Sequence, residues 1–490
     1  MNAIIILITV GIYFILQLAV SFRKSTTANS DFFSGSRQSK WYVVAFAMIG
    51  ASISGVTYVS VPGMVNKSGF GYLQLVMGFI VGQLIIAFVL TPLFYRMKLT
   101  SVYEYLSNRF GLKAYHTGAW FFFISKMLGA AVRLFLVCFI LQMLAFEPLG
   151  IPFIVNVFIS VGFVWLYTHR GGVKSVIWAD VIKTCCLIIS VALCIYFIAR
   201  DMGLSLTGTF HAIGQSSMSK MLFFDDSNDK QFFFKQFLAG IFTMIATNGL
   251  DQDMMQRNLS CRNSRESQKN MIFSIVLQFV VVSAFLMLGV LLYLFAAQHG
   301  MSETGDKLFP AIATGPYLPM IVGILFIVGL ASSAYNAAGA ALTALTTSFT
   351  IDILGGHSLS EKRVKSLRQR VHLGMAILMG VVIIAINILN STSVVDAVYT
   401  LASYTYGPLL GMFAFGIIMK QQVHDRYVPW VAVAAPVLCF ILDKHSMQWF
   451  NGYQFSYEIL IFNALFTFLG LCLLIRRHNH ETNPNIGTSI

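Results

Sequence analysis

Charged residues are scarce in this chain of 490 residues: Asp, Glu, Lys and Arg make up 11% of it, against 57% hydrophobic residues. Apolar segments of about 20 residues, the length that crosses a hydrocarbon core, recur from end to end. No polar stretch is left that is long enough for a soluble domain. The composition therefore predicts an all-α polytopic membrane protein, with a single membrane domain over 1–490.

Cysteine and histidine are also sparse, with seven and ten residues. The cysteines fall within apolar segments or in loops that we assign to the inner side, so structural disulfides are not expected. His169 and His424 have no evident partner, and His478 and His480 lie in a short tail. Because a membrane enzyme needs a nucleophile with a base, or a metal cluster, near one face, the sequence predicts neither an enzyme nor a cofactor.

Thirteen segments are predicted to span the membrane, at 3–22, 41–65, 72–95, 115–145, 151–168, 176–199, 232–250, 271–297, 318–350, 371–389, 394–419, 428–442 and 457–475. With the N-terminus outside, 23 of the 33 Lys and Arg residues fall in inner loops and six in outer loops. This is the positive-inside pattern, so the net charge of +13 reflects topology and not a nucleic-acid partner. We expect a bacterial-type cytoplasmic membrane protein with its C-terminus inside. The first 22 residues lack a basic start and a small-residue cleavage site, so a retained span is expected.

An odd number of spans fits two five-helix repeats of opposite orientation with additional peripheral helices. Spans 2 to 6 would form repeat one, over 41–199, and spans 7 to 11 repeat two, over 232–419. The peripheral parts are the first span (1–22), the last two spans (428–476) and a short cytoplasmic tail (477–490).

Both repeats begin with an interrupted apolar run. Residues 50–55 read Gly-Ala-Ser-Ile-Ser-Gly, and Pro62-Gly63 is predicted to end that span. In repeat two, Thr247-Asn248-Gly249 stands just before Asp251. Unwound backbone at such points exposes carbonyls that can hold a cation, and helix N-termini that favour an anion. Breaks at equivalent positions predict a transporter that works by alternating access.

Residues 329–352 are built largely from Ala, Gly, Ser and Thr. A helix with so little side-chain bulk lets neighbouring backbones approach closely. Inside a membrane such a surface serves helix packing or a small-ligand site.

Several motifs, in order and at the appropriate spans, together resemble the sodium:solute symporter family, with sialic-acid and sugar-type bacterial members the most similar. They are 31–37 (Asp-Phe-Phe-Ser-Gly-Ser-Arg), Ser54-Gly55 with Pro62-Gly63, 100–106 (Thr-Ser-Val-Tyr-Glu-Tyr-Leu) with Arg109-Phe110-Gly111, Gly171-Gly172, Trp178, Asp180, and Asp251-Gln252 with Gln256-Arg257. The resemblance covers nearly the whole chain. It implies a LeuT-type fold of about 13 transmembrane helices, with a 5+5 inverted repeat whose halves each start with a broken helix.

The same resemblance implies a sodium ion between the first broken helix and the span at 318–350. The implied carbonyl ligands are those of Gly50 and Ile53. Counting back from Asp352, the family's hydroxyl ligands fall on Asn336, Ala337, Gly339 and Ala340, none of which carries a hydroxyl. Ser332 and Ser333 lie one turn away and would require a register shift. The sequence thus predicts an altered sodium site.

Asp180 and Lys183 are three residues apart on one helix face of the span at 176–199, and can pair. A lysine ammonium where sodium would sit supplies the same positive charge permanently, and a buried ammonium can also cycle a proton. Alternatively, Lys183 snorkels to the cytoplasm. The combined hypothesis is that sodium coupling is weakened or replaced.

Lys126 and Arg133 are seven residues apart on one face of the span at 115–145, and the cost of buried charge turns that face into the bundle. The planar guanidinium of Arg133 suits a carboxylate, as in the family's sialic-acid members, although it could instead satisfy carbonyls of a kinked backbone. The candidate substrate-binding residues are Ser52, Ser54, Thr57, Gln74, Gln83, Arg133, Thr247, Asn248, Thr400 and Ser403.

These observations predict a secondary transporter that imports a small polar solute, a sugar or sugar acid. The bilayer and the solute are its expected partners, and it would be a monomer or a loose oligomer. Two alternatives stay open. The first is a sodium-independent or proton-coupled transporter, and the second is a solute sensor that binds without transport.

Overall fold

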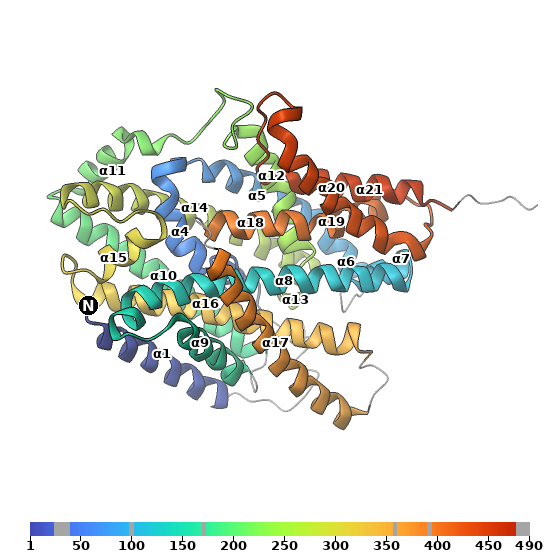
Figure 1. Cartoon of the computed structure of the whole chain (residues 1–490), viewed down its shortest axis with the longest axis horizontal. Coiled ribbons are helices and arrows are strands. Elements are labelled where there is room, and N and C mark those ends of the chain that lie inside the picture. Colours follow the sequence, from blue (N-terminus) through green and yellow to red (C-terminus); the bar gives the residue numbers. More distant parts are fainter. Residues whose placement is uncertain (24–39, 98–101, 169–172, 356–359, 390–393, 477–490) are drawn as a thin grey trace, which may run out of the picture.

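The computed structural model describes residues 1–23, 40–97, 102–168, 173–355, 360–389 and 394–476. Within these ranges the chain is almost entirely helical, and an isolated β-bridge joins Val423 and Ile475. The helices run mostly along the long axis of an elongated bundle (Figure 1).

Repeat one contains α3 (Trp41–Ser52), α4 (Gly55–Ser68), α5 (Tyr72–Ile85), α6 (Thr91–Met97), α8 (Leu112–Leu141), α9 (Phe153–Thr168) and α10 (Val173–Asp201). Repeat two contains α12 (Phe233–Met244), α13 (Gln252–Leu259), α14 (Ser264–Gln298), α16 (Met320–Ser348), α17 (Glu361–Leu389), α18 (Val394–Thr405) and α19 (Gly407–Ile418). Outside the repeats lie α1 (Ala3–Arg23), α20 (Val428–Trp449) and α21 (Ile459–Leu473), and the short helices of the connections are α7 (Glu104–Arg109), α11 (Leu206–Gln215) and α15 (Leu308–Thr314).

Among the described residues, seven helices are long and apolar enough to cross a membrane, and nine spans result if each of two bent helix pairs counts as one. Three shorter apolar helices, at Ala3–Ala19, Phe153–Thr168 and Ile459–Leu473, also occur. A multi-pass membrane architecture follows. The count of thirteen spans and the side on which each terminus lies stay predictions.

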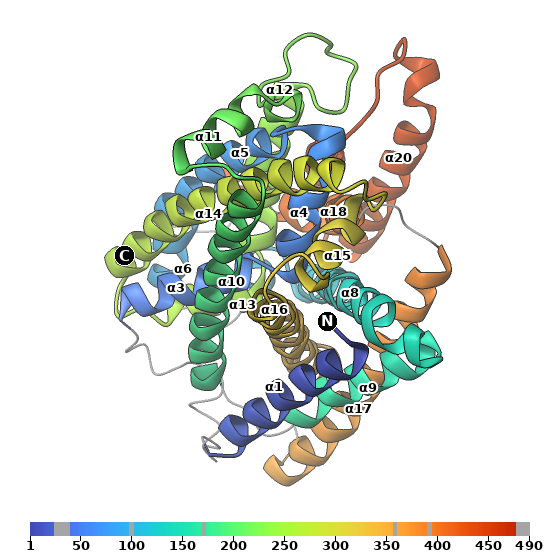
Figure 2. The same ribbon diagram turned by 90° about the vertical axis from the view of Figure 1, so that its left-hand side faces the viewer.

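Contacts between the two halves are reciprocal. The broken helix that opens repeat one consists of α3 and α4, and its half α4 packs on α14, the next long helix of repeat two. In the same way α12, the first half of the broken helix of repeat two, packs on α5. Likewise α8 packs on α18 and α16 on α10, and the two fourth helices, α9 and α17, pack on each other. Two inverted copies of one five-helix unit produce this pattern. In both views α1, α9 and α17 lie on one side of the bundle, with α12 and α20 on the opposite side (Figures 1 and 2).

Backbone-to-backbone packing holds α5 against α12. A Cβ atom on Gly78 would lie 2.1 Å from the carbonyl oxygen of Phe237, and one on Gly240 would lie 2.1 Å from that of Leu75. Only glycine permits this approach, which brings the two repeats into direct van der Waals contact.

The described part of the bundle contains three helix breaks. At Ile53 and Ser54 the backbone is extended, and α3 and α4 meet at a bend of 56°. The second break follows a π-helical turn, Ile245–Gly249, and lies at Leu250 and Asp251 before α13. The third lies at Tyr406, where α18 and α19 are bent by 46°. The first two are the breaks that the sequence predicts for the start of each repeat.

The helix after the first break extends beyond its predicted end. Pro62-Gly63 was expected to terminate it, but α4 continues to Ser68. The physical role of Gly63 is close approach, since a Cβ there would lie 2.4 Å from the carbonyl oxygen of Gly305. Its own carbonyl accepts a hydrogen bond from the Tyr293 hydroxyl at 2.6 Å. Gly63 therefore allows the loop before α15 to pack directly against α4.

Candidate functional site

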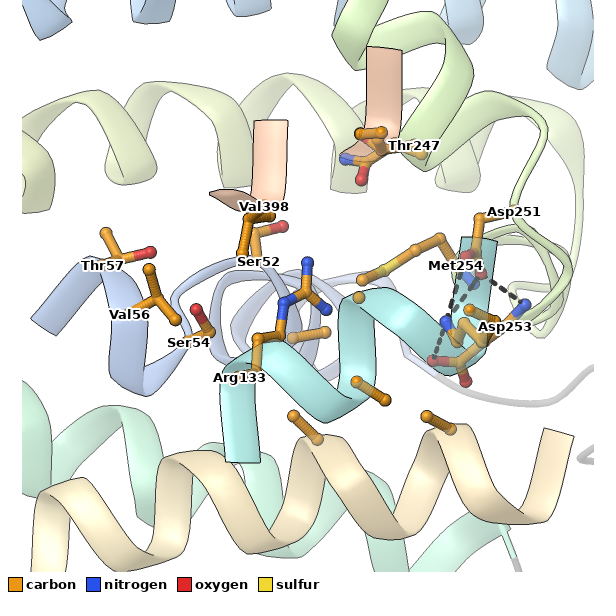
Figure 3. A pocket seen from close by; sticks show the side chains of 18 of the residues that line it. Ser52, Ser54, Val56, Thr57, Arg133, Thr247, Asp251, Asp253, Met254 and Val398 are labelled. Carbon is orange, nitrogen blue, oxygen red and sulfur yellow. Dashed lines mark hydrogen bonds and ion pairs between the residues drawn. The ribbon is translucent and has the colours of Figure 1, made fainter. Parts of the chain in front are cut away.

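One pocket lies where the three helix breaks converge (Figure 3). Side chains from α3, α4, α8, α10, α12, α13, α16 and α18 contribute to its wall. The predicted candidates that line it are Ser52, Ser54, Thr57, Arg133, Lys183, Thr247, Asn248, Asn336, Ala337 and Ala340. The structure thus brings together residues that are almost 300 positions apart in the sequence.

Hydroxyl groups from the first break form one part of the wall. Ser54 occupies the N-cap position of α4, but its side chain makes no capping hydrogen bond. Ser52 and Thr57 lie beside it on the pocket wall (Figure 3). Across the pocket, the Thr247 hydroxyl donates to the Thr243 carbonyl at 2.9 Å. These groups can hydrogen-bond a polyhydroxylated solute.

Arg133 extends from α8 into the pocket, between the serines of the first break and the aspartates of the second (Figure 3). Within the described ranges no carboxylate forms an ion pair with it. Its charge acts on the hydroxyls of Tyr399 and Tyr406, which line the same pocket. A partly buried guanidinium in this position can bind an anionic group through two parallel hydrogen bonds.

A buried ion-pair network forms the pocket wall at the second break. The Lys126 ammonium lies 3.0 Å from both carboxylate oxygens of Asp251 and 3.4 Å from Asp253. Arg257 approaches Asp253 at 3.4 Å, and the Tyr406 hydroxyl donates to Asp251 at 3.0 Å. Lys126 and Asp251 are 8% and 3% exposed, so this is a pairing inside the protein and not a surface one.

Tyrosines from α5 and α18 also line the pocket. The hydroxyls of Tyr72 on α5 and Tyr399 on α18 are 2.7 Å apart, and both side chains line the pocket. The rings of Tyr399 and Tyr457 are 5.1 Å apart, and Tyr457 donates a short hydrogen bond to Asp396. Sequence reasoning missed these residues because tyrosines in apolar helices resemble ordinary core residues.

Only some of the residues implied as cation ligands line the pocket. Asn336, Ala337 and Ala340 line the pocket, and the Asn336 amide oxygen accepts a hydrogen bond of 2.5 Å from Gln17 of α1. Gly339 instead packs against Tyr167, whose hydroxyl would lie 1.8 Å from an added Cβ. Ile53 lies at the break itself, and Gly50 is a buried residue of α3, but neither lines the pocket.

Lys183 of α10 is 1% exposed and lines the pocket. The side chain of Asp180, its predicted partner, is outside the described part of the structure. The Lys183 side chain therefore lies inside the bundle and lines the same pocket as Asn336 and Ala337. A lysine that replaces a bound cation must be buried in this way.

Ser333 offers a hydroxyl at the first break. Its side chain is fully buried, and its oxygen has no hydrogen-bond partner among the described residues. A Cβ on Gly55, the first residue of α4, would lie 3.3 Å from that oxygen. The sequence predicts that Ser333 needs a register shift to reach the cation site, and the structure places it, together with Leu330, against Gly55 at the break.

Four predicted substrate-binding residues do not line the pocket. Gln74 donates to the Gln231 carbonyl at 2.9 Å and accepts from the Phe223 amide at 3.0 Å, so it anchors the loop before α12. The remaining three are Gln83, which is buried, Thr400, which is exposed, and Ser403, which bonds to the Tyr399 carbonyl at 2.8 Å.

Comparison with known proteins identifies relatives along most of the chain. A model of the sodium:solute symporter family matches residues 32–424. The human sodium/iodide cotransporter is 24% identical over 437 residues, and this match covers 85% of the chain but only 65% of the length of that protein. The sodium/sialic acid symporter NanT of Aliivibrio fischeri is 25% identical over 471 residues, which covers 91% of the chain and 87% of that protein.

Among solved structures, the substrate-bound outward-open state of a Na+-coupled sialic acid symporter aligns with a TM-score of 0.79 at 19% sequence identity. The alignment covers 96% of this chain and 97% of that one. At this identity the similarity shows a shared fold, and it agrees with the inverted repeat described above.

Proposed function

The chain belongs to the sodium:solute symporter family, and from this premise we propose that it is a secondary active transporter importing a small anionic, sugar-like solute by alternating access. The observation that carries the proposal is Arg133, a guanidinium in the pocket with no ion pair among the described residues. The bacterial relative that transports sialic acid supports a sugar acid as the solute class. In the proposed orientation the N-terminus is outside and the C-terminus inside.

Two neighbouring sets of groups would recognise such a solute. Arg133 would hold the carboxylate through its planar fork, because that geometry matches both carboxylate oxygens. Ser52, Ser54 and Thr57 lie beside it and would hydrogen-bond the ring hydroxyls. A neutral sugar would leave Arg133 without a partner, which costs binding free energy in a partly desolvated pocket.

We further propose that Lys183 replaces the coupling sodium ion. Its side chain is buried and lines the same pocket as Ala337 and Ala340, two positions at which the family resemblance implies sodium ligands. Sodium prefers several oxygen ligands, and these two alanines provide none from their side chains. The Lys183 ammonium would then stabilise the packing of α10 against the break, and its reversible deprotonation would allow proton coupling.

One observation favours a second candidate, in which sodium coupling persists at a displaced position. The buried Ser333 hydroxyl has no partner in the described structure and faces the first residue after the break. A sodium ion held there would depend on Ser333 and not on Lys183, so Ser333→Ala and Lys183→Met separate the two candidates.

Uptake of labelled solutes by proteoliposomes tests the proposed function. Sialic acid and a neutral hexose are compared, with Arg133→Ala as the binding-deficient control. We expect accumulation of the acid by the unaltered protein only. Equal accumulation of the neutral sugar would contradict the anionic-solute proposal, and binding of the acid without accumulation would identify a sensor.

A further inference from the structure

The carboxylate of Asp251 is a junction of three separate elements. It caps α13, since its Oδ1 accepts hydrogen bonds from the amides of Asp253 at 2.9 Å and Met254 at 3.3 Å. It also accepts from Lys126 of α8 at 3.0 Å and from the Tyr406 hydroxyl at 3.0 Å. Tyr406 itself lies at the break between α18 and α19. One buried side chain therefore connects two helix breaks to a helix of the other repeat.

This junction lies between the pocket and one end of the bundle. Asp251, Asp253, Met254 and Arg257 line the pocket, so α13 forms part of its wall. From there α13 leads to Cys261, whose carbonyl accepts a hydrogen bond of 3.0 Å from Tyr95 of α6. Two arginines adjoin this contact in the sequence, Arg96 in the last turn of α6 and Arg262 directly after Cys261, and we call this end of α13 the basic end.

Charge pairing resists movement of α13 away from α8. Removing one partner of a buried ion pair leaves the other charge without compensation, and this is strongly unfavourable. The Lys126 ammonium contacts Asp253 as well as Asp251, so both carboxylates must leave it before α13 can swing out. Movement of α13 away from α8 therefore requires that this network be broken or replaced.

Tyr406 connects the network to the solute. A phenolic O–H donates to one acceptor at a time, and Asp251 is its acceptor in this structure. The Tyr406 side chain also lines the pocket, within electrostatic reach of Arg133. An anionic group bound to Arg133 offers this hydroxyl a second charged acceptor.

We propose that Asp251, Lys126 and Tyr406 form a latch that keeps the path to the basic end closed, and that an anionic solute weakens it by taking the Tyr406 hydroxyl. This inference rests on the proposed transport function. Asp251 and Lys126 are positioning residues, because they hold α13 and α8 together without being the main contacts of the solute.

Cys261 provides a native reporter of the latch. It is fully buried in a small apolar cluster with Val44 and Met48 of α3 and Met254 of α13. Burial raises the pKa of its thiol to about 12, with Glu266 adding to the rise, so little reactive thiolate forms while α13 is seated. When α13 moves off α3, the thiol becomes accessible to a maleimide, and mass spectrometry measures its modification in the otherwise native protein.

The experiment compares the rate of Cys261 modification in purified protein without solute. Asp251→Asn and Tyr406→Phe should each raise it by about tenfold, which corresponds to about 1.4 kcal/mol. Tyr399→Phe is the matched control, since its hydroxyl lines the same pocket but pairs with Tyr72. It should leave the rate unchanged. Sialic acid should raise the rate in the unaltered protein and have little further effect on Tyr406→Phe.

Three results would overturn the proposal: an unchanged rate in Tyr406→Phe, an equal increase in Tyr399→Phe, or sialic acid that binds without changing the rate. Tyr406→Phe removes a single oxygen, so it decides the matter if Asp251→Asn fails to fold. The solute-free comparison does not depend on which solute is transported. If sialic acid does not bind but the variants behave as expected, the latch stands and the proposed solute is wrong.

Discussion

Replacement of Arg133 by alanine should abolish high-affinity binding of an acidic solute. The guanidinium projects into the pocket and has no competing ion pair in the described structure, so its hydrogen-bonding capacity is available to the solute. A hydrogen bond to a charged group contributes about 1.5–3 kcal/mol, and a bidentate contact makes two. The loss of about 3–6 kcal/mol corresponds to an affinity about 10² to 10⁴ times weaker.

Isothermal titration of the purified protein with sialic acid and with its uncharged amide measures this loss. The unaltered protein should distinguish the two ligands strongly, whereas Arg133→Ala should bind both weakly and almost equally. Arg133→Lys keeps the charge but not the planar fork and should fall between them. Lys220→Ala controls for the general loss of a positive charge, because Lys220 is an exposed residue paired with Asp225. Unchanged discrimination in Arg133→Ala would refute the assignment.

Three further predictions concern the scaffold and the coupling site. Gly240→Ala should lower the melting temperature, because the added Cβ clashes with the Leu75 carbonyl and overpacking typically costs about 1–3 kcal/mol. Gly162→Ala is the matched control and should not lower it, because the space around its Cβ is open. Burial raises the pKa of Asp306 above its ordinary value, and nearby Asp396 adds to the rise, so the neutral acid is favoured in the folded state. This preference contributes stability that is fully present below the unfolded pKa of about 4 and is lost as pH rises through the folded pKa of Asp306. Asp306→Asn, which is neutral at every pH, should therefore raise the melting temperature at pH 7. A gain in melting temperature that persists undiminished near pH 4 would disprove this reasoning. Lys183→Met should abolish uptake, but restored uptake on addition of sodium would show that the lysine stands in for that ion.

The sequence was sufficient to predict the breaks at the start of each repeat. A Gly-Ala-Ser-Ile-Ser-Gly run inside an apolar span offers little side-chain packing to hold a continuous helix, and the structure is extended at Ile53 and Ser54. Burial of Lys126 and the placement of Arg133 in the pocket followed from the cost of exposing charge to lipid. These predictions depend on local composition and on the solvent, both of which are visible in one chain.

Features set by tertiary packing could not be predicted in the same way. Phe349–Ile353 forms a π-helical turn after α16, a feature that no sequence pattern indicated. Within α16, Gly339 packs on Tyr167 and Ser333 lies against Gly55, and both contacts depend on helices that are distant in the sequence. Similarly, Pro62-Gly63 resembles a helix end until the loop at Gly305 is seen to pack against it. Sequence reasoning also missed the third break, at Tyr406, although Gly407-Pro408 directly after it is a turn signal and opens α19.

Solute uptake with sodium and proton gradients imposed separately tests the central claim most directly. Proteoliposomes containing the purified protein are loaded so that only one gradient is present, and accumulation of labelled sialic acid is measured in each case. We predict accumulation that does not require a sodium gradient and is eliminated by Lys183→Met. Accumulation that requires sodium, is indifferent to a proton gradient and is lost in Ser333→Ala would contradict the replacement of sodium by Lys183.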